Sequence, residues 1–269
     1  MKQMKNAIQS KAKFLLDADI AKCFDCIDHF ALLEKLNMRG KVRQQIKAWL
    51  KSGVIDHGAF TATFEGKPQA GVISPLLANI ALHGWENTLK QYASTLKLRH
   101  PDRGVMSTRD KKYSLTFIRY ADDFVVLDED KAVVQGCREI ISEWLKGIGL
   151  QLKPEKTRLT HRFRNELSED GFAGFDFLGH HIQQYPAGKY RSSKSTTQEI
   201  IGFNTLITPS KKASKVHQEE VGRIIRKHRS SPQSALIRDL NPVIRGWTSY
   251  YSNSDIKTVP ETSRQDQLT

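Results

Sequence analysis

Two adjacent aspartates, Asp122 and Asp123, lie between two short runs of β-branched and aromatic residues, at 116–120 and 124–127. Residues of these types favour β-strands, so the sequence predicts a β-hairpin with residues 121–123 at its turn. Two carboxylates at a tight turn repel each other, and a hard divalent cation such as Mg²⁺, which prefers carboxylate oxygens, would relieve that repulsion. The alternative is an ordinary aspartate-rich turn, because Asp is common in turns through local hydrogen bonds.

A third carboxylate comes from residues 14–28, where an apolar run is followed by several acids. The run is predicted to be a buried strand, and Asp19 would lie at its end, where it could meet the hairpin pair. In the alternative interpretation the acids are surface residues before a helix: Asp17, Asp19, Asp25 and Asp28. Asp28 fits that alternative, because leucines at 32, 33 and 36 begin a helical spacing behind it.

Three further segments show helical patterns. Ser74 followed by Pro75 predicts an N-cap and first turn, after a loop rich in Gly and Pro. Apolar spacing predicts helices over 42–50 and 133–145. The polar segment 98–112 between them is expected to be a surface loop.

Five motifs, in their order and spacing, resemble reverse transcriptases. They are Asp-Ile-Ala-Lys-Cys-Phe-Asp at 19–25, Pro-Gln-Ala-Gly-Val-Ile-Ser-Pro-Leu-Leu-Ala-Asn at 68–79, Tyr-Ala-Asp-Asp at 120–123, Lys-Pro-Glu-Lys-Thr at 153–157 and Phe-Leu-Gly at 177–179. The 73–79 block and the tail at 241–251 resemble group II intron-encoded reverse transcriptase/maturases in particular. The resemblance extends over nearly the whole chain.

This resemblance implies an α+β fold, with a right-hand polymerase palm of antiparallel sheet and packed helices over residues 1–180. A helical thumb or maturase domain is implied over 181–269. The implied function is RNA-directed DNA polymerase of a group II intron, with an RNA-binding maturase region. The implied partners are intron RNA, a template–primer and deoxynucleoside triphosphates.

The resemblance also assigns roles to the acids. Asp19 and Asp122 resemble the carboxylates that bridge two Mg²⁺ ions, Asp123 completes the cluster, and the Ile20 carbonyl is a further candidate ligand. The chemistry suits such a site, because two metals about 4 Å apart stabilise the attacking and leaving oxygens of a phosphoryl transfer together.

Nucleotide and primer contacts are implied in the same way. Phe24 matches the bulky side chain beneath the sugar that selects deoxynucleotides, and Gln69 matches the glutamine that contacts the incoming nucleotide. Lys156 resembles the lysine near the departing pyrophosphate. Without the resemblance, Phe24 would be interpreted as a core aromatic and Lys156 as a solvated charge. The turn that holds the primer terminus is matched by Phe177, Leu178 and Gly179.

Positive charge is concentrated in the last third of the chain. The net charge is +13, the pI is about 9.6, and twelve Lys or Arg but four acidic residues lie between His180 and Ser252. Such a surface favours a polyanionic partner. The candidate RNA-binding residues are Arg223, Arg226, Lys227, Arg229 and Arg245.

Three helices are predicted in this region, the second starting at Ser231-Pro232 and the third at Asn241-Pro242. Apolar residues at helical spacing are interpreted as core rather than as base-stacking platforms. They are Val243, Trp247, Tyr250 and Tyr251.

Some features depart from the family pattern. The chain begins almost at the first catalytic strand, where the family has a preceding basic fingers region, and Ala70 stands where the family usually has Gly. These departures lead us to expect a fragment truncated at the fingers. The alternative to an active polymerase is a non-catalytic RNA-binding splicing maturase or a degenerate remnant. The absence of a membrane-length apolar run and of a signal peptide leads us to expect a cytoplasmic protein.

Overall fold

The structure is a computed structural model that describes residues 13–21, 26–52, 54–56, 59–61, 73–100, 104–187, 202–252 and 254. The chain divides into two compact units. The described residues of the first unit lie within Lys13–Thr160 and Ser168–Asp170. Those of the second unit are His161–Leu167 and the residues from Gly171 onward.

A five-stranded sheet forms the centre of the first unit. Its strands follow the order β6-β7-β1-β8, and β9 also pairs with β1. The pairs β6–β7, β7–β1 and β1–β8 are antiparallel. The strands are β1 (Phe14–Ala21), β6 (Thr116–Tyr120), β7 (Asp123–Asp128), β8 (Gln151–Leu152) and β9 (Arg158–His161). The expected hairpin and the expected first strand are both confirmed.

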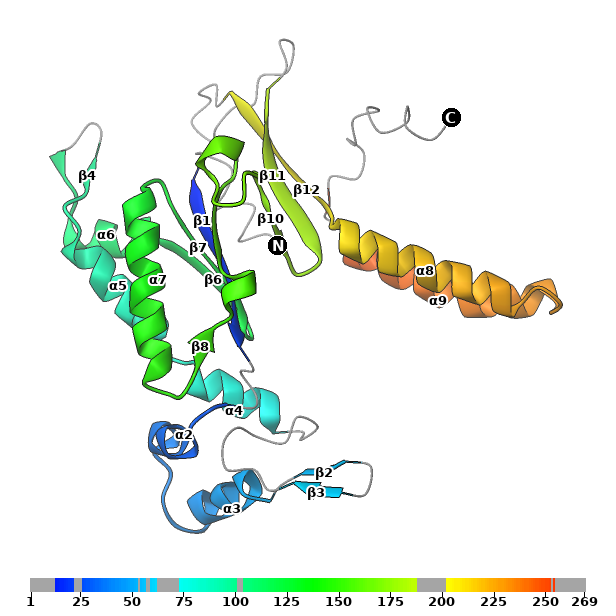
Figure 1. The fold of residues 1–269 in the computed structure, drawn as a ribbon, viewed down its shortest axis with the longest axis horizontal. Coiled ribbons are helices and arrows are strands. Elements are labelled where there is room, and N and C mark those ends of the chain that lie inside the picture. Colours follow the sequence, from blue (N-terminus) through cyan, green and yellow to red (C-terminus); the bar gives the residue numbers. More distant parts are fainter. Residues whose placement is uncertain are drawn as a thin grey trace. The chain divides into compact units, whose positions relative to one another are not determined.

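The described part of the first unit also contains six helices and two short hairpins (Figure 1). The helices are α2 (His29–Leu36), α3 (Gly40–Leu50), α4 (Ser74–Ala81), α5 (Trp85–Thr95), α6 (Thr108–Ser114) and α7 (Lys131–Lys146), with the 3₁₀ turn η1 (Pro154–Lys156). The hairpins are β2 (Val54–Asp56) with β3 (Ala59–Thr61), and β4 (Arg99–His100) with β5 (Gly104–Val105).

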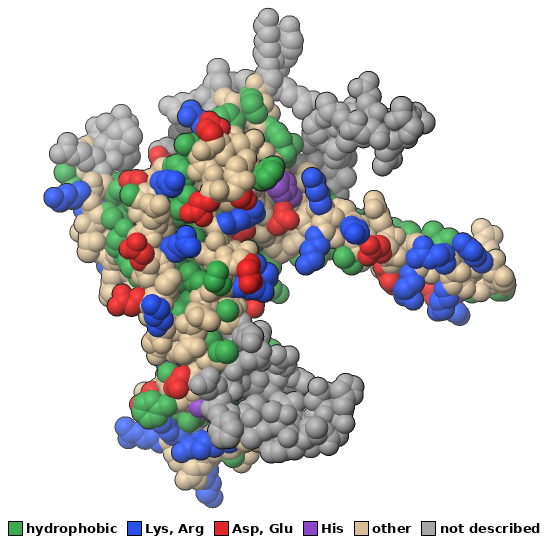
Figure 2. All heavy atoms as spheres, viewed as in Figure 1, with side chains coloured by type: hydrophobic (Ala, Val, Ile, Leu, Met, Phe, Trp, Pro, Cys, Tyr) green, Lys and Arg blue, Asp and Glu red, His purple; other side chains and the backbone are tan. Residues whose placement is uncertain are grey.

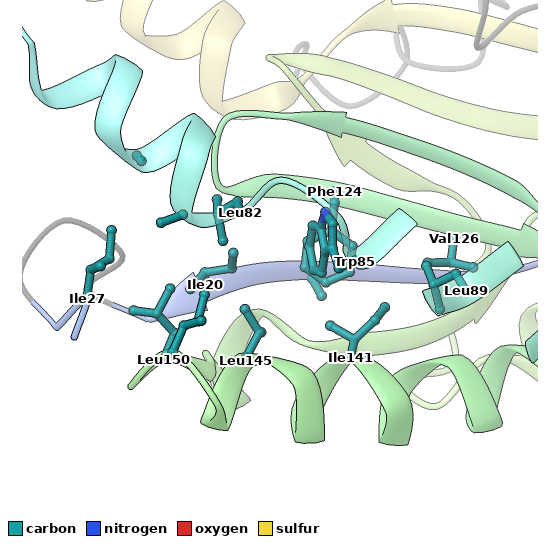
Figure 3. Close-up of a cluster of buried hydrophobic side chains, with 14 of the residues drawn as sticks. Ile20, Ile27, Leu82, Trp85, Leu89, Phe124, Val126, Ile141, Leu145 and Leu150 are labelled. Carbon is teal, nitrogen blue, oxygen red and sulfur yellow. The ribbon is translucent and has the colours of Figure 1, made fainter. Parts of the chain in front are cut away.

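One face of the sheet packs against α5 and α7 to form the core. Trp85 of α5 is 1 % exposed, and its ring centroid lies 4.7 Å from Phe124 and 5.2 Å from Phe117. Figure 3 shows α7 running along β1, with Ile141 and Leu145 among the buried side chains between them. Because side chains alternate along a strand, Ala18 and Ile20 face this core, whereas Asp17 and Asp19 point to the opposite face.

The second unit combines a small sheet with a helix pair. Strands β10 (Phe175–Phe177), β11 (His180–Pro186) and β12 (Phe203–Pro209) form a three-stranded antiparallel sheet. After the 3₁₀ turn η2 (Asn165–Leu167) and these strands, α8 (Lys211–Lys227) and α9 (Gln233–Tyr250) pack on each other. No helix in the described part of the chain is long and apolar enough to cross a bilayer.

Three expectations are corrected. The C-terminal region has two helices rather than three, because Pro242 lies inside α9. An interior proline costs an isolated helix ~3 kcal/mol, but α9 continues through it and packs on α8, where Trp247 stacks on His217 with ring centroids 4.2 Å apart. Ser74 is the first residue of α4 and Ile73 is its N-cap. Residues 98–112 contain β4, β5 and the start of α6 rather than a loop alone.

Candidate active site and nucleic-acid surface

The acids predicted from two distant segments meet at one end of the sheet. Asp19 of β1 is directly opposite Asp123 of β7 in the antiparallel register. Directly opposed residues place their Cβ atoms about 4.5–5.5 Å apart. Asp123 also pairs with Tyr120, so the hairpin turn consists of Ala121 and Asp122.

The acids lie on the face of the sheet away from the Trp85 core. Asp123 precedes the fully buried Phe124 of the core, and Asp19 precedes Ile20, which is 2 % exposed. Alternation along both strands therefore directs the two carboxylates to the same face. The Ile20 side chain is buried in the core, so the backbone carbonyl is the only group of Ile20 that could be a metal ligand.

Basic side chains accompany the acids of β1. The Lys156 ammonium forms an ion pair with the Asp19 carboxylate, and the Lys153 amide donates to the Asp19 carbonyl at 2.8 Å. Arg158 pairs with Asp17 at 3.4 Å. The two bases are two positions apart, as are the two acids, so β9 and η1 place a cation beside each outward acid of β1. The sequence contains no local signal for the Asp17–Arg158 pair.

The site has an excess of negative charge. Burial raises the pKa of Asp123 above its ordinary value, the carboxylates of Asp19 and Asp122 raise it further, and Lys156 opposes them. The hydrogen bond to Asp19 raises the pKa of Lys156. A lysine with a raised pKa stays charged at neutral pH, while Asp123 is more costly to ionise than an isolated aspartate.

These donors suit a hard divalent cation in their chemistry. Carboxylate oxygens are the ligands that Mg²⁺ prefers, and the raised pKa of Asp123 shows that added positive charge would be favourable there. As the side chains stand, no group of three or more His, Cys, Asp or Glu side chains within the described ranges is arranged around a common metal position. Lys156 supplies the positive charge at Asp19 instead.

The predicted primer turn is well defined within the second unit. Phe177 ends β10 and is 4 % exposed, and Leu178 and Gly179 form the turn into β11 with φ of 48° and 72°. The hydroxyls of Tyr250 and Tyr251 donate to the carbonyls of Leu178 and Gly179, at 2.9 and 3.1 Å. The sequence interpretation placed both tyrosines in the core, yet Tyr251 is 4 % and Tyr250 is 56 % exposed. Their shared role at the turn was missed.

Figure 2 shows basic side chains gathered where α8 and α9 are joined. Two of the candidate RNA-binding residues are already paired with acids: Arg223 with Glu220 at 2.6 Å, and Lys227 with Asp239 at 3.3 Å. The other three have exposed side chains and no recorded acidic partner in the described part of the chain. They are Arg226, Arg229 and Arg245. The remaining predicted nucleotide-binding residues, Phe24 and Gln69, lie outside the described residues.

Comparisons with known proteins identify the family to which the chain belongs. A family model described as reverse transcriptase (RNA-dependent DNA polymerase) matches residues 1–182, and a second, for the group II intron maturase-specific domain, matches residues 214–265. The chain therefore belongs to the reverse transcriptase family, and within it to the group II intron members that carry a maturase domain. The expected family and the α+β fold class are confirmed.

Two curated relatives show the extent of the likeness. Protein YkfC of Escherichia coli (strain K12) is 32 % identical over 197 residues, which are 67 % of this chain and 49 % of the relative. The group II intron-encoded protein LtrA of Lactococcus lactis subsp. cremoris is 26 % identical over 246 residues, covering 74 % of this chain and 40 % of LtrA. The chain thus spans half or less of these relatives. A solved telomerase structure from Candida albicans has a TM-score of 0.47 at 12 % identity, covering 94 % of this chain and 41 % of that one.

Proposed function

We propose that this protein catalyses RNA-templated DNA synthesis from deoxynucleoside triphosphates and binds the RNA of its group II intron. The observation that carries the proposal is the direct opposition of Asp19 and Asp123, with Asp122 at the adjoining turn. The carboxylates of Asp19 and Asp123 share the face of the sheet that the core leaves available, and Asp122 adjoins them in the sequence at the turn.

Asp19, Asp122 and Asp123, with the Ile20 carbonyl, are the groups that would hold a pair of Mg²⁺ ions. When bound, such ions supply charge stabilisation to the attacking and leaving oxygens of an in-line phosphoryl transfer. The protein itself contributes mainly position and charge, because phosphoryl transfer leaves it little covalent work.

Lys156 is the group best suited to the leaving pyrophosphate. Its pKa is raised by Asp19, so it remains an ammonium at neutral pH and can donate to a developing negative charge. Its side chain is 55 % exposed, which leaves it free to approach a nucleotide. We assign Phe24 to exclusion of the 2′-hydroxyl and Gln69 to contact with the incoming nucleotide.

The second unit would hold nucleic acid. We assign the turn at Phe177, Leu178 and Gly179 to the primer terminus. We assign the exposed arginines Arg226, Arg229 and Arg245 to intron RNA. Contacts from Lys and Arg to phosphates supply affinity without sequence readout. A long helix pair carrying exposed arginines fits that role.

The test is primer extension on an RNA template by the intact gene product with Mg²⁺. We expect templated synthesis that Asp122→Ala abolishes, while Glu139→Ala, an exposed acid on α7, leaves it unchanged. Absence of synthesis together with salt-sensitive RNA binding would support the non-catalytic maturase instead. Synthesis that persists in Asp122→Ala would remove this site from the reaction.

A further inference from the structure

Arg119, near the end of β6, connects the acidic turn to two helices. Its Nη1 donates to the Ala121 carbonyl at 3.1 Å and to the Asn79 Oδ1 of α4 at 3.2 Å. Its Nε lies 3.6 Å from the Glu86 Oε1 of α5, in an ion pair. The guanidinium group therefore contacts the turn, α4 and α5 together.

The pleat of β6 explains why this side chain reaches those helices. Arg119 and Phe117 are two positions apart, so they lie on the same face of the strand. Phe117 packs edge-on against Trp85 of α5, which identifies that face as the core face. The Arg119 side chain therefore lies on the face of the sheet that packs against the helices, whereas the carboxylates of Asp19 and Asp123 lie on the opposite face.

The turn needs such support because of its backbone. Ala121 has φ 55°, in the left-handed region that side-chain-bearing residues rarely adopt. Two-residue hairpin turns that require a positive φ usually place Gly or Asn there. The bond from Arg119 satisfies the Ala121 carbonyl, and the planar fork of a guanidinium fixes the direction of that bond.

We propose that Arg119 is a positioning residue that locks the Ala121–Asp122 turn onto Asn79 and Glu86 and thereby sets the Asp122 carboxylate for metal binding and catalysis. The expected effect on catalysis rests on the polymerase function proposed above. The support of the turn by Arg119 follows from the contacts alone and does not depend on that function. Asn79 acts here through its bond with Arg119.

The experiment compares the parent with Arg119→Met, Arg119→Lys, Asn79→Ala and Ala121→Gly. The control is Arg138→Met, which removes an arginine that pairs with Glu169 away from the turn. Three readouts are taken: amide hydrogen exchange of residues 120–123, single-nucleotide incorporation with kcat and KM measured separately, and Mn²⁺ binding. Mn²⁺ binding followed by electron paramagnetic resonance reports on the metal site without catalysis.

We expect Arg119→Met to speed exchange at the turn, weaken Mn²⁺ binding and lower kcat roughly 10–100-fold, since small misplacements of reacting groups have effects of that size. KM should change little. Ala121→Gly, which removes the strain, should restore part of the kcat and of the exchange protection in the Arg119→Met background. Arg119→Lys should rescue poorly, because an ammonium group lacks the fork.

Unchanged exchange at residues 120–123 in Arg119→Met would overturn the proposal, as would equal losses in the Arg138→Met control. If Arg119→Met does not fold, Asn79→Ala provides the same readouts from a single exposed contact. If the parent itself does not polymerise, exchange and Mn²⁺ binding still test the support of the turn, so failure of the proposed function is distinguishable from failure of this inference.

Discussion

Asp19 and Asp123 are directly opposed across β1 and β7, and the Asp19 carboxylate helps burial to raise the pKa of Asp123. Lys156 contacts one of the two and partly offsets this repulsion. The site is therefore arranged to receive positive charge.

Replacing Asp123 by Asn should stabilise the metal-free protein at neutral pH. The pKa of Asp123 is raised in the folded state, so between its ordinary value of about 3.8 and the raised value the folded state binds more protons than the unfolded state. Stability is therefore lost as pH rises through that window. Asp123→Asn removes this loss of stability. Each 1 kcal/mol gained in the free energy of unfolding corresponds to a Tm increase of roughly 2–4 °C in a chain of this size.

Thermal unfolding with a chelator, from pH 4 to pH 8, measures this effect. The Tm difference between Asp123→Asn and the parent should grow with pH, and Mg²⁺ should raise the Tm of the parent more than that of the variant. Glu139→Gln is the control. A Tm difference between Asp123→Asn and the parent that does not change with pH would contradict the raised pKa of Asp123.

Replacing Lys156 by Met should affect catalysis far more than stability. The Lys156 side chain is 55 % exposed, and exposed ion pairs contribute only ~0–1 kcal/mol. Loss of a positioned proton donor lowers rates by about 10²–10⁴-fold. Single-turnover incorporation should fall in that range for Lys156→Met, less for Lys156→Arg, and little for Lys153→Met. Equal losses for Lys153→Met and Lys156→Met would show that Lys156 has no special role.

Replacing Gly179 by Ala should destabilise the second unit. Gly179 has φ 72°, and a Cβ there would lie 2.8 Å from the Tyr251 hydroxyl oxygen. We expect a loss of ~1–3 kcal/mol in urea unfolding. Gly171→Ala is a matched control, with the same φ and open space around it, and should lose less.

Tyr251→Phe removes that hydroxyl and its bond to Gly179, at a cost of ~0.5–1.5 kcal/mol. Because the two residues touch, the double variant should lose less than the sum of the single losses. Additive losses would mean that the clash does not occur.

Salt dependence should distinguish the cations of α8, α9 and their connection that are paired with acids from those that are not. Replacing Arg226, Arg229 and Arg245 together by Gln should reduce the slope of log affinity for structured RNA against log salt by about 2–3, at ~0.7–0.9 per phosphate contact. Replacing Arg223 and Lys227, which are paired with acids, should change it less. Filter binding or fluorescence anisotropy between low and physiological salt measures both slopes. A larger effect from the paired set would place the RNA surface elsewhere.

The sequence alone predicted the elements whose signals are local. Alternating β-branched and aromatic residues specified the β6–β7 hairpin, and helical spacing located α3 and α7. Asp28 was correctly interpreted as a cap, and its carboxylate accepts from the Ala31 amide at 2.7 Å. Local rules failed at Pro242. A proline there would break an isolated helix, but α9 continues through it and packs on α8.

Only the tertiary structure decided which side chains meet. The sequence predicted Asp19 at the end of a strand and Asp123 in a hairpin turn, but their direct opposition is a property of the register between strands far apart in the chain. The ion pair of Lys156 with Asp19 and the contacts of Arg119 with Asn79 likewise join distant segments. Periodicity determines which face of its own element a residue occupies, because it follows from backbone geometry. Which elements pack together depends on burial over the whole chain, and no local pattern contains that information.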